Sequence, residues 1–332
     1  MADLVQRLIA AFEREGIASC HWKGAAALER GLAGERDLDF LVPPAAFERA
    51  EGVLVATGFK AARPRFGADV PGTAHFFGHE PTLERLLHVH LHDRVLTGED
   101  LITSHTLPLA ELFLASPARA HGVRVPTPAQ ETLLTVLKHA IRWGSLPDLA
   151  LAVLAPKDEQ TALTQLLTEE NIVAATALLG SACPALDTAT FRACADSLRA
   201  GRRSPTLAAR VRRALRPHAN FGRLGRLAAY AEVAAARARR FLDGDRRDKL
   251  LRGRGVLVAF VGGDGAARAA AVAETARWLG QAFAVRAAAA GAPPPGEIWL
   301  TDAEPAGPAP DLRIDVAGLD RASLRARVWA AL

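Results

Sequence analysis

The chain lacks the features that mark disulfide-rich secreted proteins and membrane-spanning proteins. Its 332 residues include only three cysteines and one methionine. Cys20, Cys183 and Cys194 have no metal-ligand spacing and leave an odd thiol, which fits a reduced cytosol and excludes a disulfide framework. No apolar run approaches the roughly 18 residues that a bilayer span needs, and the charged N-terminus does not resemble a signal peptide. We expect a cytoplasmic protein without a transmembrane segment.

Lysine is also scarce, because five of the 41 basic residues are Lys and the remaining 36 are Arg. Together with the abundant Ala, this bias reflects the source genome before it reflects function, and Ala inflates the apparent helicity. The length is too great for one ordinary core and fits two or three domains. Half of the residues are apolar, which allows a sizeable core.

Two polar segments near the N-terminus combine residue types that suit phosphate and metal binding. Asp37 and Asp39 stand two apart where an apolar run begins, so on a strand both carboxylates would project from one face. Such a pair suits a divalent cation such as Mg²⁺, with phosphates and water as further ligands. Upstream, Lys23 and Gly24 precede a helix expected at residues 25–32, and Gly lets a phosphate approach a helix N-terminus. For the acidic pair alone, a solvated strand start is the alternative.

Taken together, these segments resemble the motif of polymerase-β-like nucleotidyltransferases, in which Gly-Gly or Gly-Ser is followed, after a spacer, by Asp-hydrophobic-Asp-hydrophobic. Here the motif reads Gly24-Ala25, eleven residues, then Asp37-Leu38-Asp39-Phe40, with Ala25 in place of the usual Gly or Ser. The resemblance implies transfer of a nucleotidyl group from an NTP to an acceptor. It implies that Asp37 and Asp39 hold Mg²⁺ or Mn²⁺ and that Lys23 and Gly24 position phosphates.

Residues 86–92 alternate between His and aliphatic side chains, which predicts a strand with His88, His90 and His92 on one face. The resembling family carries a third acidic residue on a later strand, and we expect His90 at that place. There an imidazole would coordinate the metal or act as a general base, with Asp93 as the fallback acid. One strand cannot bring all three imidazoles to one zinc ion, because its first and fifth residues lie about 13 Å apart. A polar, partly solvated sheet face is the alternative.

More narrowly, the chain resembles bacterial proteins that join such a domain to a thymidylate-kinase-like P-loop module. A strand at 255–261, a Gly-rich turn and a helix to residue 279 give the context that a P-loop requires. Counted from Gly262, the places of the motif's Gly-Lys-Ser/Thr are taken by Ala267, Arg268 and Ala269. The phosphate-binding Lys has become Arg, a poor geometric substitute, and the Mg²⁺-binding hydroxyl has become a methyl. We expect an inactive remnant with a packing or dimerising role, formed by Gly262, Asp264, Gly265 and Arg268.

The fold class expected from these patterns is α/β, in three domains. Residues 1–106 would form an α+β nucleotidyltransferase-like domain, 107–242 a helical domain and 243–332 the P-loop-like remnant. Residues 63–82, rich in Pro and Gly, would be a hairpin or a long loop near the site. A strong helix is expected after Thr127, and its Lys138, His139 and Arg142 would face either a triphosphate or solvent, solvent being favoured.

An Arg-rich stretch from 199 to 255 carries a net charge of about +13. Charge of this density suits phosphates or another polyanion, although few aromatic residues are present to stack bases. A solvated linker is the alternative interpretation. Two other functions therefore stay open beside the enzyme: a catalytically degenerate nucleotide-binding or scaffolding protein that acts with a partner enzyme, and a nucleic-acid-binding protein. The acceptor and a homo-oligomeric state also stay open.

Overall fold

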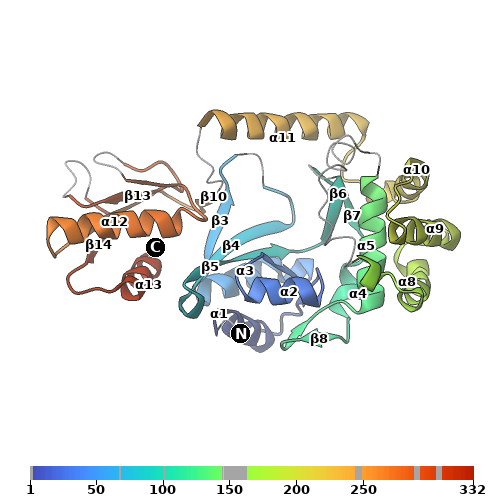
Figure 1. Cartoon of the computed structure of the whole chain (residues 1–332), viewed down its shortest axis with the longest axis horizontal. Helices are drawn as coiled ribbons and strands as arrows, with labels where there is room; N and C mark the ends of the chain where they lie inside the picture. The colour runs from blue at the N-terminus through green and yellow to red at the C-terminus, as the bar shows by residue number, and fades with distance from the viewer. Residues whose placement is uncertain are drawn as a thin grey trace.

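The computed structural model describes residues 3–66, 69–99, 102–143, 145, 163–243, 249–287, 292–303 and 309–332. The α/β class is confirmed. The molecule is elongated, with a central sheet between a C-terminal sheet at one end and a group of helices at the other (Figure 1). No helix in the described part of the chain is long and apolar enough to cross a membrane.

A six-stranded mixed sheet forms the centre of the molecule, in the order β1-β2-β5-β4-β3-β10. Its strands are β1 (Cys20–His21), β2 (Leu38–Leu41), β3 (Lys60–Pro64), β4 (Thr73–Glu80), β5 (Arg85–His92) and β10 (Lys249–Leu251). The helices that pack on it are α1 (Asp3–Arg14), α2 (Ala25–Leu32) and α3 (Phe47–Ala56), with the short η1 (Pro44–Ala46) and η2 (Pro81–Leu83) between elements. Phe12, Phe40 and Val89 are among the buried residues of the core that these elements share.

The expected alternation on residues 86–92 is confirmed, because Leu87, Val89 and Leu91 are buried in this core while the His side chains lie on the other face. The expected helix at 25–32 has the predicted bounds. Of the two alternatives for residues 63–82, the hairpin is found, since β3 and β4 pair in antiparallel fashion.

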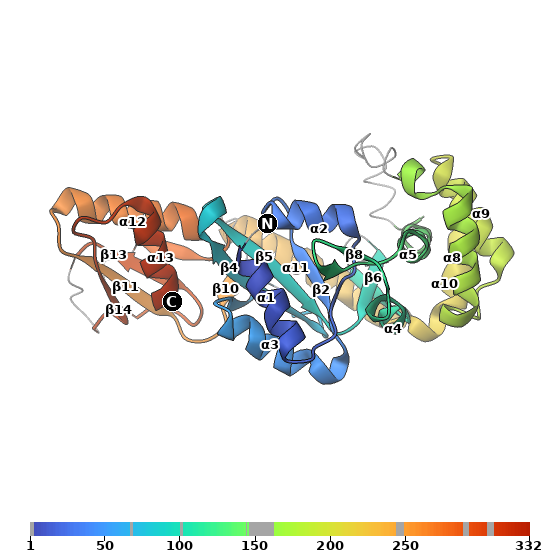
Figure 2. The ribbon, with the colours of Figure 1, turned by 90° about the horizontal axis from the view of Figure 1, so that it is seen from below.

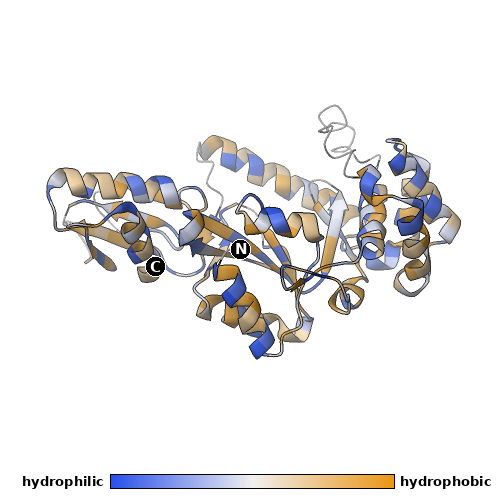
Figure 3. Ribbon diagram, turned by 60° about the horizontal axis from the view of Figure 1, so that its bottom comes forward, coloured by the Kyte–Doolittle hydropathy of each residue, from blue (hydrophilic) through white to orange (hydrophobic). Residues whose placement is uncertain are grey.

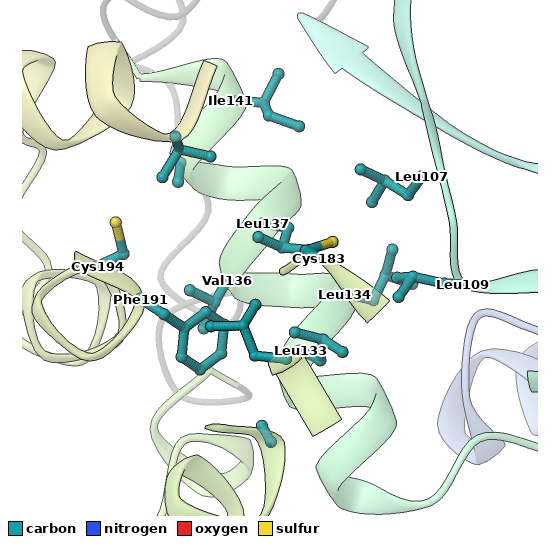
Figure 4. Packing of buried hydrophobic residues seen from close by; sticks show 14 of the residues in the cluster. Leu107, Leu109, Leu133, Leu134, Val136, Leu137, Ile141, Cys183, Phe191 and Cys194 are labelled. Atoms are coloured by element: carbon teal, nitrogen blue, oxygen red, sulfur yellow. The ribbon is translucent and has the colours of Figure 1, made fainter. Parts of the chain in front are cut away.

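The helical part is built around α5 (Pro128–Arg142), which begins with a capping box between Thr127 and Gln130. Figure 4 shows α5 between Leu107 and Leu109 on one side and Phe191 and Cys194 on the other, within one buried cluster. The helices of this part are α4 (Ala110–Leu114), α8 (Glu169–Ala182), α9 (Thr188–Arg199) and α10 (Pro205–Ala214), followed by η3 (Arg216–His218). Two hairpins lie between it and the central sheet, formed by β6 (Val95–Glu99) with β7 (Ile102–Leu107) and by β8 (Arg119–Ala120) with β9 (Val123–Arg124). Pro147 and Pro156, in the connection between α5 and α8, lie outside the described residues.

The C-terminal part is a four-stranded parallel sheet in the order β12-β13-β11-β14. Its strands are β11 (Val256–Val261), β12 (Val285–Ala287), β13 (Ile298–Thr301) and β14 (Leu312–Asp315), and its helices are α12 (Gly265–Leu279) and α13 (Arg321–Ala331). The two inner strands, β11 and β13, are hydrophobic over most of their length, as the centre of a parallel sheet requires (Figure 3).

Helix α11 (Arg223–Asp243) runs along one side of the molecule and leads from the helical part back to the central sheet (Figures 1 and 2). After it, β10 pairs with β3 in antiparallel fashion and completes the sheet that the N-terminal residues began. Residues 249–251 fall within the expected third domain, yet they share a sheet with the first. The side chains of Ala62 and Phe77, from β3 and β4, are accordingly buried in one cluster with residues of α12 and β11.

Candidate functional site

One row of the central sheet brings together three polar residues from three strands. The parallel register of β2 and β5 places Asp39 opposite His90, and the antiparallel register of β4 and β5 places His75 opposite His90. Residues opposite one another in a sheet share a face, so Asp39, His90 and His75 form a line across it. The next rows add His88 on one side and His92 on the other.

Asp39 is buried and is held by three donors that all contact Oδ1. Lys23 Nζ lies 2.8 Å away, His92 Nε2 3.2 Å and His90 Nδ1 3.3 Å. Burial alone would raise the pKa of Asp39, but the hydrogen bonds from His90 and His92 and the Lys23 ammonium together lower it well below the ordinary value. Asp39 is therefore a permanent anion at the centre of the site.

Asp37 directly precedes β2 and is half-exposed, on the same face as Asp39. Its Oδ1 lies 2.9 Å from His88 Nδ1, and its Oδ2 lies 3.6 Å from His90 Nε2. Burial raises the pKa of Asp37, but the hydrogen bond from His88 and the charges of His88 and His90 together lower it below its ordinary value. His90 thus has one ring nitrogen near each carboxylate, and the structure brings Asp37, Asp39 and His90 together.

The segment before α2 holds Lys23 and Gly24 at the edge of this cluster. The Trp22 backbone N–H donates to the Asp39 carbonyl at 3.2 Å, which fixes the turn that follows β1. Gly24 has a φ of 89°, a backbone region that favours glycine, and a Cβ there would collide with the Glu131 carboxylate of α5. The Glu131 carboxylate therefore occupies the space next to Gly24 into which a phosphate would otherwise come. Burial raises the pKa of Glu131.

A cavity of about 710 Å³ opens beside the cluster, between the central sheet, the β6–β7 hairpin and α5. Its volume is typical of small-molecule sites. Its charged lining comprises Lys23, Arg36, Lys138 and Arg142, opposed by Glu131, with His75, His90 and His92 at the sheet face. Four basic side chains against one carboxylate make this a cavity for an anion.

Residues 1–155 match the model of a family described as an uncharacterised nucleotidyltransferase. The match supports a nucleotidyltransferase domain in this part of the chain, and we call it the nucleotidyltransferase-like region. It contains the acidic pair, all four imidazoles of the sheet face and the four basic residues of the cavity. Comparison with curated proteins found no match, and comparison with solved structures found none either.

Three residues of the nucleotidyltransferase-like region were not expected at the site from the sequence. His75 belongs to the hairpin or long loop expected near the site, but no role was predicted for it, and it occupies the middle of the site face on β4. Arg36 and Glu131 carried no local pattern that pointed to a cavity. In contrast, the fallback acid Asp93 is bound by Arg94 through both carboxylate oxygens and is not among the residues that line the cavity. Of the helix residues that were expected to face solvent, Lys138 and Arg142 line the cavity.

The glycine-rich turn after β11 has a different geometry from a phosphate-binding loop. The Asp264 carboxylate caps α12 by accepting from the Ala267 backbone N–H at 2.7 Å. The Arg268 guanidinium turns back and donates to the carbonyls of Gly263 and Asp302, at 3.2 and 3.0 Å. A Cβ at Gly262 would collide with the Asp315 carboxylate. Gly265 is the first residue of α12, so all four expected residues of the remnant lie at this turn.

The Arg-rich stretch is spread over several elements, and part of its charge is paired. Arg212 donates to the carbonyls of Ile141 and Trp143 at the end of α5, and Arg252 pairs with Glu51 at 3.0 Å. A groove of about 950 Å³ between α9 and α10 is larger than the cavity at the sheet, and its lining includes four Ala and three Arg with one carboxylate, that of Asp187. It has no convergent catalytic groups, so we place the candidate site at the sheet.

Proposed function

We propose that the nucleotidyltransferase-like region transfers a nucleotidyl group from an NTP to an acceptor in a metal-dependent reaction. The observation that carries this proposal is the convergence of Asp37, Asp39 and His90 beside a cavity lined by four basic side chains. The family match over residues 1–155 supports the reaction class. No residue pattern in the described part of the chain identifies the acceptor.

The two carboxylates are suited to a divalent cation such as Mg²⁺ or Mn²⁺. The three donors to Asp39 all contact Oδ1, which leaves Oδ2 as the oxygen that would hold a cation together with Asp37. When bound, such an ion would supply the positive charge that neutralises the developing charge on the α-phosphate. The Lys23 ammonium helps to keep Asp39 ionised and compensates the charge of its carboxylate when no cation is bound.

The basic residues of the cavity would bind and orient the triphosphate. Lys23 lies on the same side of the cavity as the acidic pair, whereas Lys138 and Arg142 approach from α5. Charges fixed on separate elements can hold an extended polyanion in one pose, which is the main requirement of phosphoryl chemistry.

His90 is the residue that we assign to the acceptor or to the metal. Its Nε2 is buried and has no hydrogen-bond partner among the described residues. The Nδ1 proton is directed at the Asp39 carboxylate, so Nε2 carries the lone pair that can take a proton from an attacking hydroxyl.

A screen with α-labelled NTPs and Mg²⁺ or Mn²⁺ tests the proposal. Label transfer to a cellular metabolite or macromolecule fraction should be lost by at least about 100-fold in Asp37→Asn and in Asp39→Asn. Asp196→Asn, an exposed acid on α9 that pairs with Arg199, is the control and should transfer label as the wild type does. Transfer that survives in both site variants would refute the role of the acidic pair.

We also propose that the C-terminal part is a kinase-like remnant that binds no nucleotide. Arg268 already fills the hydrogen-bonding positions around the glycine-rich turn, and Asp264 puts a carboxylate where a phosphate would sit. Calorimetric titration of the full chain with an NTP should therefore show one binding event, which Lys23→Ala removes. A second event that persists in Lys23→Ala would contradict this.

A further inference from the structure

Three imidazoles on β4 and β5 form a cluster whose geometry the acidic pair does not explain. His75 and His90 are cross-strand partners, and His88 lies two residues before His90 on the same face. One ring nitrogen from each of the three lies within 4.8 Å of one from each of the others. His88 and His92 are too far apart on β5 to bind one ion, but His75 on the neighbouring strand β4 lies next to His88 and His90 and can supply the third ligand.

The hydrogen bonds of this cluster determine which ring nitrogens carry lone pairs. A carboxylate only accepts, so His88 Nδ1, 2.9 Å from Asp37 Oδ1, carries a proton and His88 Nε2 does not. His90 Nδ1 lies 3.3 Å from Asp39 Oδ1 and Nε2 lies 3.6 Å from Asp37 Oδ2, and the shorter contact assigns the proton to Nδ1. Nε2, which is buried and makes no hydrogen bond among the described residues, then carries the lone pair. His88 Nε2 in turn lies 3.2 Å from His75 Nδ1.

We propose that His75, His88 and His90 form a binding site for a transition-metal dication of the zinc class, distinct from the carboxylate site. Two nitrogen ligands of a tetrahedral zinc ion, each at about 2.0–2.1 Å from the metal, lie roughly 3.3 Å apart, and His75 Nδ1 and His88 Nε2 already have this spacing. Binding requires only that His75 carry its proton on Nε2. Imidazole suits zinc, copper, nickel and iron, whereas Mg²⁺ prefers oxygen.

In this site Asp37 and Asp39 act as orienting groups for the imidazoles. Metal-bound His usually donates its other ring N–H to a carboxylate, which fixes the tautomer and the ring orientation. Both His88 and His90 have this arrangement, one with each acid of the pair. His88 is further held by stacking on Phe77, with ring centroids 4.1 Å apart and planes inclined by 9°.

The site has three protein ligands and an open side. A second cavity, of about 470 Å³, is lined by the three imidazoles together with Asp37, Phe77 and Lys249, and His75 and His90 also line the larger cavity. Three ligands with a free position are typical of catalytic rather than structural zinc sites. The Lys249 ammonium at this position favours an anionic fourth ligand.

Metal binding can be measured directly on the full chain after removal of metals with a chelator. We expect one equivalent of Zn²⁺ to bind in competition with a chromophoric chelator. We expect one equivalent of Co²⁺ to give the visible absorption of a tetrahedral nitrogen site. His75→Ala and His88→Ala should each weaken Zn²⁺ binding by about 100-fold or more, and Asp37→Asn by about 10-fold with the Co²⁺ spectrum retained. His121→Ala, an exposed imidazole in the β8–β9 turn, should bind Zn²⁺ as the wild type does.

The inference shares His90 with the proposed function but does not rest on it. Failure of label transfer with intact Zn²⁺ binding would remove the proposed function alone. Unchanged Zn²⁺ affinity in folded His75→Ala and His88→Ala, or the absence of stoichiometric binding in the wild type, would overturn the metal site alone. If an alanine variant does not fold by circular dichroism, His75→Gln and His88→Gln replace it and are judged by the same affinities.

Discussion

Asp39 Oδ1 accepts from Lys23, His90 and His92, so a single oxygen connects this lysine to the imidazole face. His92 completes the network on its other side, because its Nδ1 lies 3.2 Å from Thr73 Oγ1 and can accept the hydroxyl proton. Each polar group in this network has a defined donor or acceptor role, which stabilises a buried charge that would otherwise be costly. The exception is His90 Nε2, whose single lone pair the two proposals use as alternatives, either for the nucleotidyl-transfer reaction or for the zinc-class ion.

Glu131 is the residue whose removal should strengthen nucleotide binding. Its carboxylate lies against Gly24 in a cavity that is otherwise cationic, so it repels a triphosphate. Glu131→Gln should lower the Kd for a non-hydrolysable NTP by roughly 5-fold or more at pH 8, as a coupling of about 1 kcal/mol implies. Because burial raises the pKa of Glu131, its carboxylate takes up a proton at a higher pH than an ordinary Glu does. The difference in Kd between the wild type and Glu131→Gln should therefore become smaller as the pH falls.

Calorimetry of the two proteins at pH 8 and pH 5.5 measures this effect. Glu111→Gln, an exposed acid on α4, is the matched control and should leave the Kd unchanged. Equal affinities of wild type and Glu131→Gln at pH 8 would show that Glu131 does not occupy the nucleotide position.

The buried imidazoles should make the protein less stable in mild acid. Burial lowers the pKa of His21 and His105 to about 4, of His139 to about 3 and of His75 to about 2. Between pH 6.5 and 4 the unfolded chain binds protons that the folded chain does not, so this stability is complete above pH 6.5 and is lost as pH falls. Each group contributes at most about 1.4 kcal/mol per pH unit. Urea unfolding from pH 7.5 to 4.5 checks this, and a flat midpoint across that range would contradict it.

Among the elements, α5 has two roles, since one side fills the core of the helical part and another lines the cavity. Its buried Leu133, Leu137 and Ile141 belong to the largest hydrophobic cluster, while Lys138 and Arg142 line the cavity. The positions of Lys138 and Arg142 in the cavity therefore depend on how firmly this helix is held. Its C-terminal carbonyls are bound by Arg212 and its N-terminus by the capping box.

Thr127→Ala tests the capping box. The Thr127 side chain accepts from the Gln130 backbone N–H, and the Gln130 side chain accepts from the Thr127 N–H at 2.8 Å. Loss of this cap should lower the free energy of unfolding by about 1 kcal/mol. Thr188→Ala, at an exposed first position of α9, should cost less than about 0.5 kcal/mol. Equal effects of the two substitutions in urea unfolding would rule out a special contribution of the cap.

Elements with a strong local pattern could be predicted from the sequence, and those defined by distant pairing could not. The helix at 25–32 and the alternation of β5 follow from local periodicity alone. The role of β4 does not, because Phe76 and Phe77 put aromatic side chains on both faces and hide the period of two that His75 would reveal. From the sequence, Gly78 in the same strand indicates a turn. In the structure it lies within β4, where a Cβ would collide with the side chains of Leu4 and Phe59.

For the candidate site, the acidic pair, Lys23, Gly24 and His90 could be found from the motif and its spacing. Glu131 and Arg36 could not, because their positions depend on how α5 and the loop before β2 pack against the sheet. The pairing of Asp37 and Asp39 with imidazoles rather than with a third carboxylate also needed the register of β2, β5 and β4.

At the scale of the whole molecule, the first and last parts of the chain are physically joined. β10 extends the central sheet, Trp329 Nε1 donates to the Gly58 carbonyl at 2.9 Å, and Arg325 Nη1 donates to the Glu84 carbonyl at 3.0 Å. Phe77 on the site-bearing sheet is covered by Phe283, with ring centroids 4.9 Å apart. The C-terminal part thus stabilises the sheet that carries the candidate site, whatever its own activity.

Removal of residues 249–332 should therefore damage the N-terminal part. The truncation exposes the edge of β3 and the ring of Phe77, so we expect aggregation or, in the soluble fraction, binding of a hydrophobic dye and a lower urea midpoint. Co-expression of residues 249–332 as a separate chain should restore solubility in part. A truncated chain with the dye binding and midpoint of the full-length protein would mean that the two parts are independent.

The position of β10 has a consequence for synthesis in the cell. The ribosome delivers the first five strands of the central sheet long before Leu251 emerges, and in that interval the nascent chain presents an unsealed β edge. Helices α8 to α11 can form locally in that interval, but the sheet with the imidazoles and the acidic pair gains its edge strand only after residues 249–251 have been synthesised. A chaperone that holds nascent chains should therefore engage this protein, and its yield should fall when translation pauses between α11 and β10.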